Sequence, residues 1–330
     1  MIKENIISTA HSTIDADSLG QLIIKLYGFK KNLVCELLHR GMNDFYLLRT
    51  EEKLFVAQVW RPNTKKMYDL NRQMEFLTYL HSGGIRVPIP QKNISNEWIF
   101  SFQGMEGNRF ACVFNFVSGE VFSKNPTESV SKSMGMIFGK LHNLSESFTI
   151  NAKDKQIKRE INILSSMPYL ENLVGHRNDD LIFYKELASE LNSIYQLSYK
   201  NDNLRIGMTH GDFHIHNAFI LGKKEITIMD FDACGVDFFA QEIMSYRWSI
   251  EKNSLSDKIW DSFLSGYDSV RTLNKDEIKS FDVFLLGKEL SYLCGFAKAI
   301  NAIGHVSFHF PGLDWFSRSL RNHSKLAKLI

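Results

Sequence analysis

The chain has 330 residues, of which 44% are hydrophobic and 23% charged, a composition typical of a folded globular protein and not of a disordered one. Its 39 Lys and Arg residues against 37 Asp and Glu leave a net charge of +2, which excludes the broad positive field of a nucleic-acid-binding protein. The four cysteines form no C-x-x-C pair, so we expect reduced thiols. No stretch is long and apolar enough to cross a bilayer, and the N-terminus has no apolar signal core. We therefore expect a cytoplasmic protein, a monomer or dimer, that binds neither nucleic acid nor membrane.

The first third of the chain predicts a small antiparallel sheet with helices. Apolar residues at three- and four-residue steps from Met67 to Leu80 predict an amphipathic helix that ends at Gly83-Gly84. The prolines of IRVPIP, which follows, predict an extended segment. The other elements predicted here are a short helix at 19–27 and five strands, at 34–39, 45–50, 53–60, 98–102 and 109–117.

From Ser118 onward the pattern is mostly helical, with one interruption, a β-rich and turn-rich run from Ile206 to Asp232. We therefore predict an α+β fold of two lobes, a sheet-plus-helix lobe over 1–117 and a helical lobe over 118–330. The chemistry is expected between the two lobes. The helices predicted in the second lobe lie at 133–144, 155–164, 180–195, 240–250, 258–270 and 283–303.

The interrupting run, MTHGDFHIHNAFILGKKEITIMDFD, concentrates polar residues around a short hairpin. Asp212 and Asn217 precede the strand AFIL, and Asp230 follows the strand ITIM, so the hairpin brings all three to one end. Phosphoryl transfer needs this arrangement: one carboxylate orients the attacking hydroxyl, while Asn and a second carboxylate hold the Mg²⁺ that bridges the phosphates. The spacing D-x-x-x-x-N followed by a strand-borne Asp is the one kinases use.

HGDFHIHN followed by IMDFD resembles the aminoglycoside phosphotransferase and choline kinase superfamily, which has a protein-kinase-like fold. FVAQVWRP, Leu141-His142 and FPGLDWF are most similar to the homoserine-kinase-like and bacterial stress-response kinases. The resemblance implies an ATP-dependent phosphotransferase that moves the γ-phosphate to a hydroxyl of a small molecule: an aminoglycoside, an amino alcohol, homoserine or a sugar-like compound. It also implies a nucleotide-binding lobe over 1–117 and a catalytic loop and acceptor site within 118–330.

Matched motif by motif, the resemblance implies a role for each polar residue of the run. Asp212 becomes the catalytic base, and His210 braces the loop that carries it. Asn217 and Asp230 become the ligands of Mg²⁺, with Asp232 as a further candidate. The nucleotide is expected to be ATP, with GTP left open.

The strand FVAQVWRP departs from the family pattern. Family members place a Lys or Arg there to hold the α- and β-phosphates, paired with an acid on the following helix. In this sequence Gln58 takes that position and Glu75 is the matching acid. A neutral amide can hydrogen-bond a phosphate but adds no charge. Arg49 is the nearest cation on the same side, about 13 Å away at strand rise, and Arg61 is expected to be a solvated surface arginine.

The remaining nucleotide-binding features are also reduced. A single Gly41, in HRGMNDF, stands where protein kinases have a glycine-rich loop, and the backbone amides near it are expected to approach a phosphate. The resemblance places the hinge at 114–117, with Phe114 and Phe116 beside adenine, although such aromatic residues are more often core. Downstream, Glu242 stands where relatives often have an Asp, and we expect it to brace a loop.

Other interpretations of the same residues stay open. One alternative is a hydrolase-type metal cluster formed by His210, His214, His216 and Asp212. Another is that the run is a polar turn with a purely structural role. Neither accounts for the Asp-Phe-Asp on the next strand. A Ser/Thr protein kinase of the stress-response type is an alternative, and Gln58 raises the alternative of a pseudokinase that only binds its ligand.

The sequence leaves the acceptor unnamed. Cationic acceptors such as choline or aminoglycosides call for acidic or aromatic pockets. The second lobe supplies such residues, but their helical spacing makes core packing the simpler explanation. They are Trp248, Trp260, Tyr267, Tyr292, Trp315, Glu242, Glu251 and Glu289.

Overall fold

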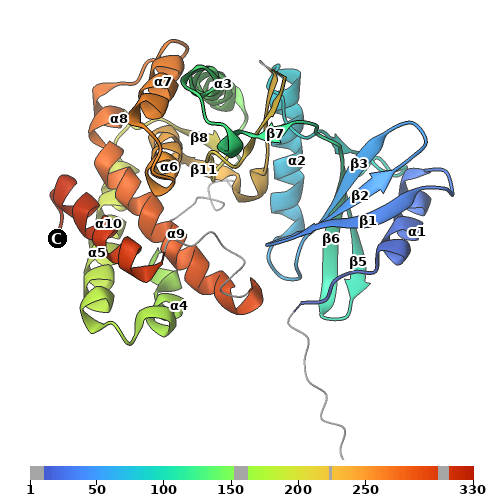
Figure 1. The fold of residues 1–330 in the computed structure, drawn as a ribbon, viewed down its shortest axis with the longest axis horizontal. Helices are drawn as coiled ribbons and strands as arrows, with labels where there is room; N and C mark the ends of the chain where they lie inside the picture. The colour runs from blue at the N-terminus through green and yellow to red at the C-terminus, as the bar shows by residue number, and fades with distance from the viewer. Residues whose placement is uncertain (1–10, 152–162, 223–224, 304–311) are drawn as a thin grey trace, which may run out of the picture. The chain divides into compact units, whose positions relative to one another are not determined.

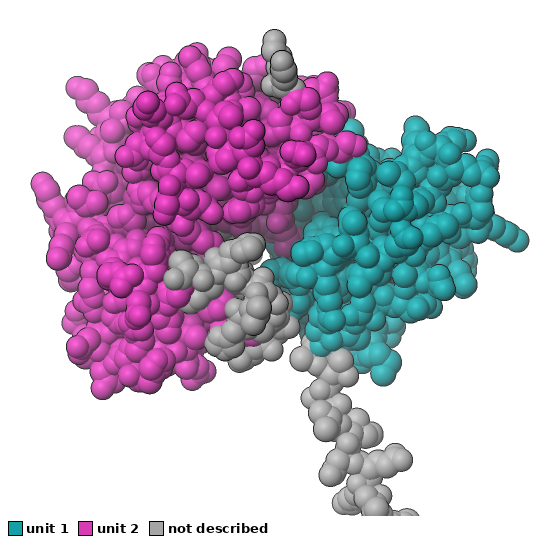
Figure 2. All heavy atoms as spheres, in the orientation of Figure 1, with its two compact units in different colours: residues 1–78, 88–117, 302–307 teal, residues 79–87, 118–301, 308–330 magenta. Residues whose placement is uncertain are grey.

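The computed structural model describes residues 11–151, 163–222, 225–303 and 312–330. Within these limits the chain forms two compact units (Figure 2). Among the described residues, the first unit contains those up to 78, 88–117 and 302–303. The second contains 79–87, 118–301 and the C-terminal residues.

The first unit is built on an antiparallel sheet in the order β1-β2-β3-β6-β4, with β5 also paired to β6. The five predicted strands are present, and the structure adds a sixth, β4, in which Pro90 and Gln91 pair with β6. The proline pattern predicted extended chain there and gave no sign that it would pair. The elements of this unit are α1 (Ala16–Tyr27), β1 (Val34–Arg40), β2 (Asp44–Arg49), β3 (Leu54–Val59), α2 (Met67–Ser82, whose last turn belongs to the second unit), β4 (Pro90–Gln91), β5 (Ile99–Gly104) and β6 (Gly107–Asn115).

Two helices pack on this sheet, α1 and α2 (Figure 1). Helix α1 buries Leu19 and Ile23 in a core shared with the sheet. It begins at Asp15, whose carboxylate caps the Ser18 N–H at 2.8 Å, and ends at Gly28, which has a positive φ of 68°. Helix α2 contacts β6, where its Met74 sulfur lies 3.7 Å from the Cys112 sulfur. Because successive side chains of a strand alternate between faces, this second contact marks the face opposite the α1 core.

The second unit is mostly helical, as predicted, with two small sheets ordered β10-β9-β7 and β11-β8. The predicted helix at 155–164 lies almost entirely outside the described residues. The elements that the sequence did not predict include β7, α8, β11 and α10. The elements are β7 (Glu120–Val121), η1 (Phe122–Lys124), α3 (Glu128–Ser147), α4 (Ile163–Val174), α5 (Asn178–Ser198), β8 (Ile206–Thr209), β9 (Ala218–Leu221), β10 (Glu225–Ile228), η3 (Phe231–Ala233), β11 (Gly235–Phe238), α6 (Phe239–Lys252), α7 (Asp257–Asp268), α8 (Lys275–Lys279), α9 (Phe281–Ile303) and α10 (Leu313–Leu326). Across the described ranges, no helix combines the length and apolarity required to cross a bilayer.

Helices α3 and α7 approach so closely that glycine is required on both. A Cβ atom on Gly135 of α3 would lie 1.9 Å from the Phe263 carbonyl oxygen. In the other direction, a Cβ atom on Gly266 of α7 would lie 2.0 Å from the Lys132 carbonyl oxygen. Backbone atoms cannot swing aside as a flexible side chain can, so the two helices would have to separate.

We therefore expect Gly135→Ala to lower the free energy of unfolding by roughly 1–3 kcal/mol, the usual range for overpacking. Urea unfolding followed by circular dichroism measures it. Gly295→Ala on α9 is the matched control, because no described atom lies within 4 Å of a Cβ built there. The control should gain up to about 1 kcal/mol of helix propensity. Equal stability of the two variants would contradict the close packing of α3 on α7.

Candidate active site

The loop between β8 and β9, residues 210–217, is anchored by alternate side chains. Phe213 is fully buried, and its ring stacks on Phe138 of α3 at 3.6 Å and on Tyr246 of α6 at 5.2 Å between centroids. Ile215 is buried as well. Asp212 and His214, which lie next to these anchors, are half-buried. Burial of Phe213 and Ile215 thus leaves the alternate residues Asp212, His214 and His216 partly or fully exposed.

Gly211 lies where the loop touches the segment that follows β10. Its φ is 89°, and a Cβ atom would lie 2.0 Å from the Ala233 carbonyl oxygen. The pairing of β8 with β11, in which Thr209 faces Gly235, brings these two segments together. Only glycine fits both the positive φ and the close approach, which explains this residue of the H-G-D motif.

The backbone brings Asp212, Asn217 and Asp230 to one end of the β9–β10 hairpin. The Asn217 side chain donates from Nδ2 to the Asp212 carbonyl oxygen at 2.9 Å. The Met229 N–H donates to the Asn217 carbonyl oxygen at 2.8 Å, and Nε2 of His210 lies 2.6 Å from the Met229 carbonyl oxygen. Asp230 follows Met229 directly, with a left-handed φ of 61°. The hairpin predicted from AFIL and ITIM is therefore confirmed, and it clusters the three residues as expected.

The Asp212 carboxylate has a cationic partner that the sequence did not reveal. Nζ of Lys288, on α9, lies 2.6 Å from Oδ1 of Asp212, and Lys288 is only 4% exposed. His214 is also close, with Nε2 3.6 Å from Oδ2 of Asp212. Burial lowers the pKa of His214 to about 4, so this ring is neutral at pH 7 and Lys288 supplies the positive charge. The one sequence signal for Lys288 is a lysine inside the apolar run FLLGKELSYL, 76 residues from Asp212.

Beneath the loop lies a buried chain of hydrogen bonds that starts at Glu242. Its Oε1 accepts from the Gly211 N–H at 2.6 Å, and its Oε2 lies 2.8 Å from Nε2 of His142. Nδ1 of His142 lies 2.7 Å from the Tyr267 hydroxyl. Burial alone would raise the pKa of Glu242, but the hydrogen bond and charge of His142, with the Gly211 N–H, hold that pKa below its usual value. Glu242 thus contacts the loop backbone, as the bracing role predicted for it requires.

The donor set at the hairpin end fits a hard divalent cation. Asn217, Asp230 and Asp232 offer amide and carboxylate oxygens, the ligands that Mg²⁺ prefers. Because Nδ2 of Asn217 is bonded to the loop backbone, its amide oxygen is the atom left to face a cation. The histidine-cluster interpretation is wrong here: in the described ranges, no three or more His, Cys, Asp or Glu residues form a group that could hold a metal ion.

In the first unit, Gln58 lies on the face of the sheet that α2 covers. Gln58 pairs with Cys112, and paired residues of antiparallel strands point to the same face, here the one contacted by Met74 of α2. The cation on α2 that lies near Met74 in sequence is Arg72. It is 8% exposed and forms an ion pair with Glu75. The acid predicted to pair with a strand cation thus contacts an arginine on its own helix, which the sequence reasoning missed.

The two arginines weighed as substitutes are both engaged elsewhere. Nε of Arg49 lies 3.0 Å from Oε2 of Glu36 on the neighbouring strand. The expectation that Arg61 is a solvated surface residue is wrong, because it is only 8% exposed and donates from Nη2 to the Gly41 carbonyl oxygen. Strand β3 ends at Val59, so strand alternation does not extend to Arg61. This arginine instead supports the turn that carries Gly41.

The two hinge aromatics differ in exposure. Phe114 is buried in β6, where it pairs with Val56 and Pro90. Phe116 is half-buried, and its N–H donates to the Leu54 carbonyl oxygen at 3.3 Å. The Phe114 ring is therefore a core residue, and any contact with a base at this position falls to backbone atoms or to Phe116.

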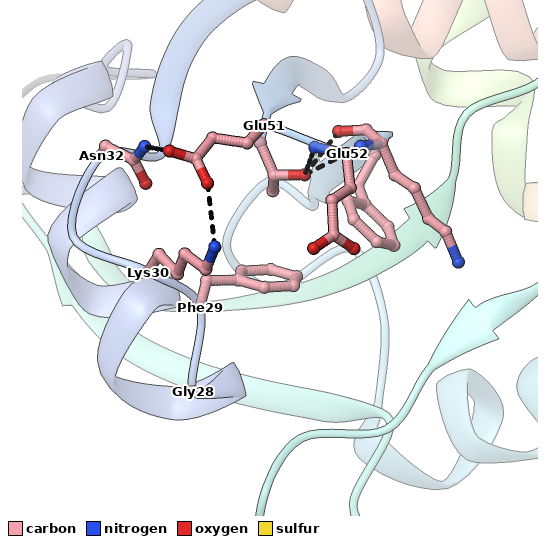
Figure 3. Close-up of a pocket in the computed structure, with 9 residues that line it drawn as sticks. Gly28, Phe29, Lys30, Asn32, Glu51 and Glu52 are labelled. Atoms are coloured by element: carbon pink, nitrogen blue, oxygen red, sulfur yellow. Dashed lines mark hydrogen bonds and ion pairs between the residues drawn. The ribbon is translucent and has the colours of Figure 1, made fainter.

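A surface pocket in the first unit contains none of the predicted site residues (Figure 3). It lies between the end of α1 and the β2–β3 turn, and its lining includes Phe29 and Glu52. Its polar groups bond to one another: Glu51 accepts from Lys30 at 2.8 Å and from Asn32 at 2.7 Å. Three of the polar side chains that line the pocket are therefore engaged with one another.

Comparison with known proteins agrees with the loop geometry. Residues 35–273 match the model of the phosphotransferase enzyme family. The chain belongs to this family. It is a phosphotransferase enzyme, as the H-G-D-x-x-x-x-N motif and the strand-borne Asp predicted.

Individual relatives are distant. A homoserine kinase of Sinorhizobium fredii is 24% identical over 254 residues, which cover 76% of this chain and 74% of that one. An uncharacterised protein of Deinococcus radiodurans is 23% identical over 292 residues, which cover 86% of this chain and 82% of that one.

Among solved structures, an amicoumacin kinase in complex with AMP-PNP and Ca²⁺ superposes with a TM-score of 0.72 at 16% identity, covering 96% of this chain and 93% of that one. A microcompartment-associated aminopropanol kinase gives 0.61 at 16%, covering 93% and 94%. These likenesses confirm the α+β, protein-kinase-like fold.

Proposed function

We propose that this phosphotransferase moves the γ-phosphoryl group of ATP to a hydroxyl of a small molecule, with Asp212 as the general base. The observation that carries the proposal is the hydrogen-bonded link from Asp212 through Asn217 to Met229, the residue before Asp230. It holds a proton acceptor and two oxygen ligands on one rigid hairpin end, which in-line phosphoryl transfer requires.

The proposed reaction is an ordinary phosphoryl transfer from ATP to the acceptor hydroxyl. The acceptor oxygen forms a bond to the γ-phosphorus while the bond from that phosphorus to the β–γ bridging oxygen breaks. The electron pair leaves with ADP, and the hydroxyl proton passes to Asp212. The contacts of His210 and Glu242 anchor the backbone beside Asp212, which would help to keep its carboxylate in place for the acceptor.

Asn217 and Asp230, with Asp232 as a further ligand, would hold Mg²⁺. When bound, the cation neutralises charge on the phosphate oxygens. Asp230 is exposed and Asp232 is half-buried. The left-handed conformation of Asp230 turns the chain at the end of β10, which suits a residue that must present its carboxylate beyond the hairpin.

The nucleotide would be held by the first unit, through the turn at Gly41, the α2 face at Gln58 and Glu75, and the segment from Phe114 to Phe116. Gln58 offers hydrogen bonds without charge. Arg72 is the cation that we assign in its place, because it is nearly buried on α2, the helix that packs on the Gln58 face. Its pairing with Glu75 parallels the strand-lysine and helix-glutamate pair of other kinases.

Two measurements on the purified chain test the proposal. Millimolar ATP with Mg²⁺ should raise the thermal midpoint, since a ligand that binds only the folded state stabilises it. ADP should then form only when a hydroxyl acceptor is added from a panel of amino alcohols, hydroxy amino acids, sugars and aminoglycosides. Stabilisation without turnover on the panel or on a protein substrate would instead favour a pseudokinase, and turnover on the protein alone would favour a Ser/Thr kinase.

A further inference from the structure

Lys288 is a nearly buried lysine whose ammonium group ends at the proposed base. Its Nζ lies 2.6 Å from Oδ1 of Asp212. Lysines are almost never buried to this extent unless they are paired. Burial of an ion pair also costs desolvation that the attraction between its charges often fails to offset, so the pair is a weak source of stability. Its place beside the base points instead to a role in the reaction.

Helix α9 is fixed where it carries Lys288. One turn earlier, the Phe284 carbonyl oxygen accepts from Nε2 of Gln241 on α6 at 3.0 Å. At the preceding residue, Gly287, a Cβ atom would collide with the hydroxyl oxygen of Tyr195 on α5. Helix α9 is therefore held closely against both α5 and α6, and the Lys288 side chain starts from a defined place.

The ammonium group of Lys288 also lies near an aromatic ring. Its Nζ is 5.8 Å from the centre of the Trp248 ring, within the range of a cation–π contact. Nζ of Lys252 lies 5.1 Å from the centre of the same ring and donates to the Tyr292 hydroxyl at 3.1 Å. Of these two ammonium groups, the one that contacts Asp212 directly is that of Lys288.

The Asp212 carboxylate is half-buried on a loop, so its orientation depends on what it contacts. His214 adds no charge there at pH 7, because burial lowers its pKa to about 4. Lys288 binds Oδ1, and an ammonium group held at one carboxylate oxygen selects one rotation of the group. A carboxylate has about four lone-pair sites, so this contact does not prevent it from accepting a proton.

We infer that Lys288 is a positioning residue for the phosphoryl transfer. It acts through Asp212, by holding the carboxylate in the rotation that meets the acceptor hydroxyl, and it binds neither the acceptor nor the phosphates. The inference rests on the proposed function, in which Asp212 is the general base. It differs from a purely structural ion pair because it requires turnover to be lost in a protein that remains folded.

Replacing Lys288 by Met tests the inference, because Met has a similar length and no charge. We expect kcat to fall by about 10- to 100-fold, as for a misplaced reacting group, while KM for ATP stays within about twofold. Circular dichroism and stabilisation by ATP with Mg²⁺ check the fold. If the Met protein does not fold, Lys288→Gln takes its place with the same criteria.

Lys298→Met is the matched control, because Lys298 is exposed on the same helix, ten residues further along. It should keep kcat within about twofold of the original. A fall in kcat of less than about 10-fold in the folded Lys288 variant would overturn the inference. So would a loss that comes from a higher KM for ATP, since Lys288 would then act on the nucleotide.

A double-mutant cycle tests whether Lys288 acts through Asp212. If it does, Lys288→Met should lower the residual rate of the Asp212→Asn enzyme by no more than about twofold, because the group that it positions is already gone. Two losses that multiply would refute the inference. Lys288→Arg keeps a charged donor and should keep more activity than Lys288→Met. Equal losses in these two variants would indicate a packing role and would also refute it.

The two levels of proposal fail differently. If Asp212→Asn keeps its kcat, the assignment of the base falls, and the positioning role falls with it. If Asp212→Asn loses activity while Lys288→Met keeps it, only the positioning role falls, and the proposed phosphoryl transfer with Asp212 as base stands.

Discussion

Replacing Asp212 by Asn should lower kcat by roughly 10²–10⁴-fold, the usual contribution of an oriented general base. The amide has the same shape as the carboxylate but cannot accept the hydroxyl proton. The change also removes the ion pair with Lys288, which leaves a nearly buried ammonium group without its 2.6 Å partner. Initial rates of ADP formation with a verified acceptor measure the loss, and KM for ATP should change little.

A second variant on the same loop serves as the control. His216 is exposed, between the buried Ile215 and Asn217, and no catalytic role is assigned to it. His216→Asn should keep activity within about twofold of the original, because substitutions of exposed side chains usually have small effects. An Asp212→Asn enzyme with a kcat close to that of the original chain would remove Asp212 from the role of base, whatever the control does.

Replacing Glu242 by Ala should reduce both stability and activity. The substitution leaves His142 and the Gly211 N–H buried without their partner, and a buried polar group left unsatisfied costs about 1–3 kcal/mol. Because Gly211 precedes Asp212, the loop should also lose its orientation and kcat should fall. Urea unfolding and initial rates on the same samples measure the two effects.

The pH dependence of stability has a defined sign. The folded-state pKa of Glu242 is lowered, so its contribution to the free energy of unfolding is fully present above the ordinary value of 4.5 and is lost as pH falls through the folded-state pKa.

Glu186→Ala is the control for the Glu242→Ala variant, because Glu186 is exposed on α5 and its replacement should change stability by less than about 0.5 kcal/mol. If the Glu242→Ala and Glu186→Ala proteins unfold at the same urea concentration, Glu242 does not brace the loop.

The catalytic half of the site was accessible from the sequence because it is local. Asp212, Asn217 and Asp230 lie within 19 residues, and a hairpin with fixed two-residue alternation dictates where its ends meet. The helix over 67–80 was predictable for the same reason, since its apolar residues repeat along one segment. The bracing role of Glu242 was predicted from the resemblance, because Glu242 stands where relatives often have an Asp.

Features that depend on distant segments escaped sequence reasoning. Arg61 reads as a surface residue, yet it is buried under the turn at Gly41 because the chain leaves strand β3 at Val59. Strand β11 has the pattern of a loop, and it forms a strand because β8 offers it hydrogen bonds. The two-residue strand β4 exists for the same reason, on the edge of β6.

By itself, then, the sequence determined the fold class, the phosphotransferase family and the loop that carries the proposed chemistry, because the motif that carries the resemblance to this family lies within one short segment. Only the tertiary structure decided the charges around that loop. Lys288 reaches Asp212 from 76 residues away, and Lys252 joins it at Trp248 because α6 and α9 pack side by side there. No local pattern encodes such a contact, because it depends on how two helices cross and not on what either one contains.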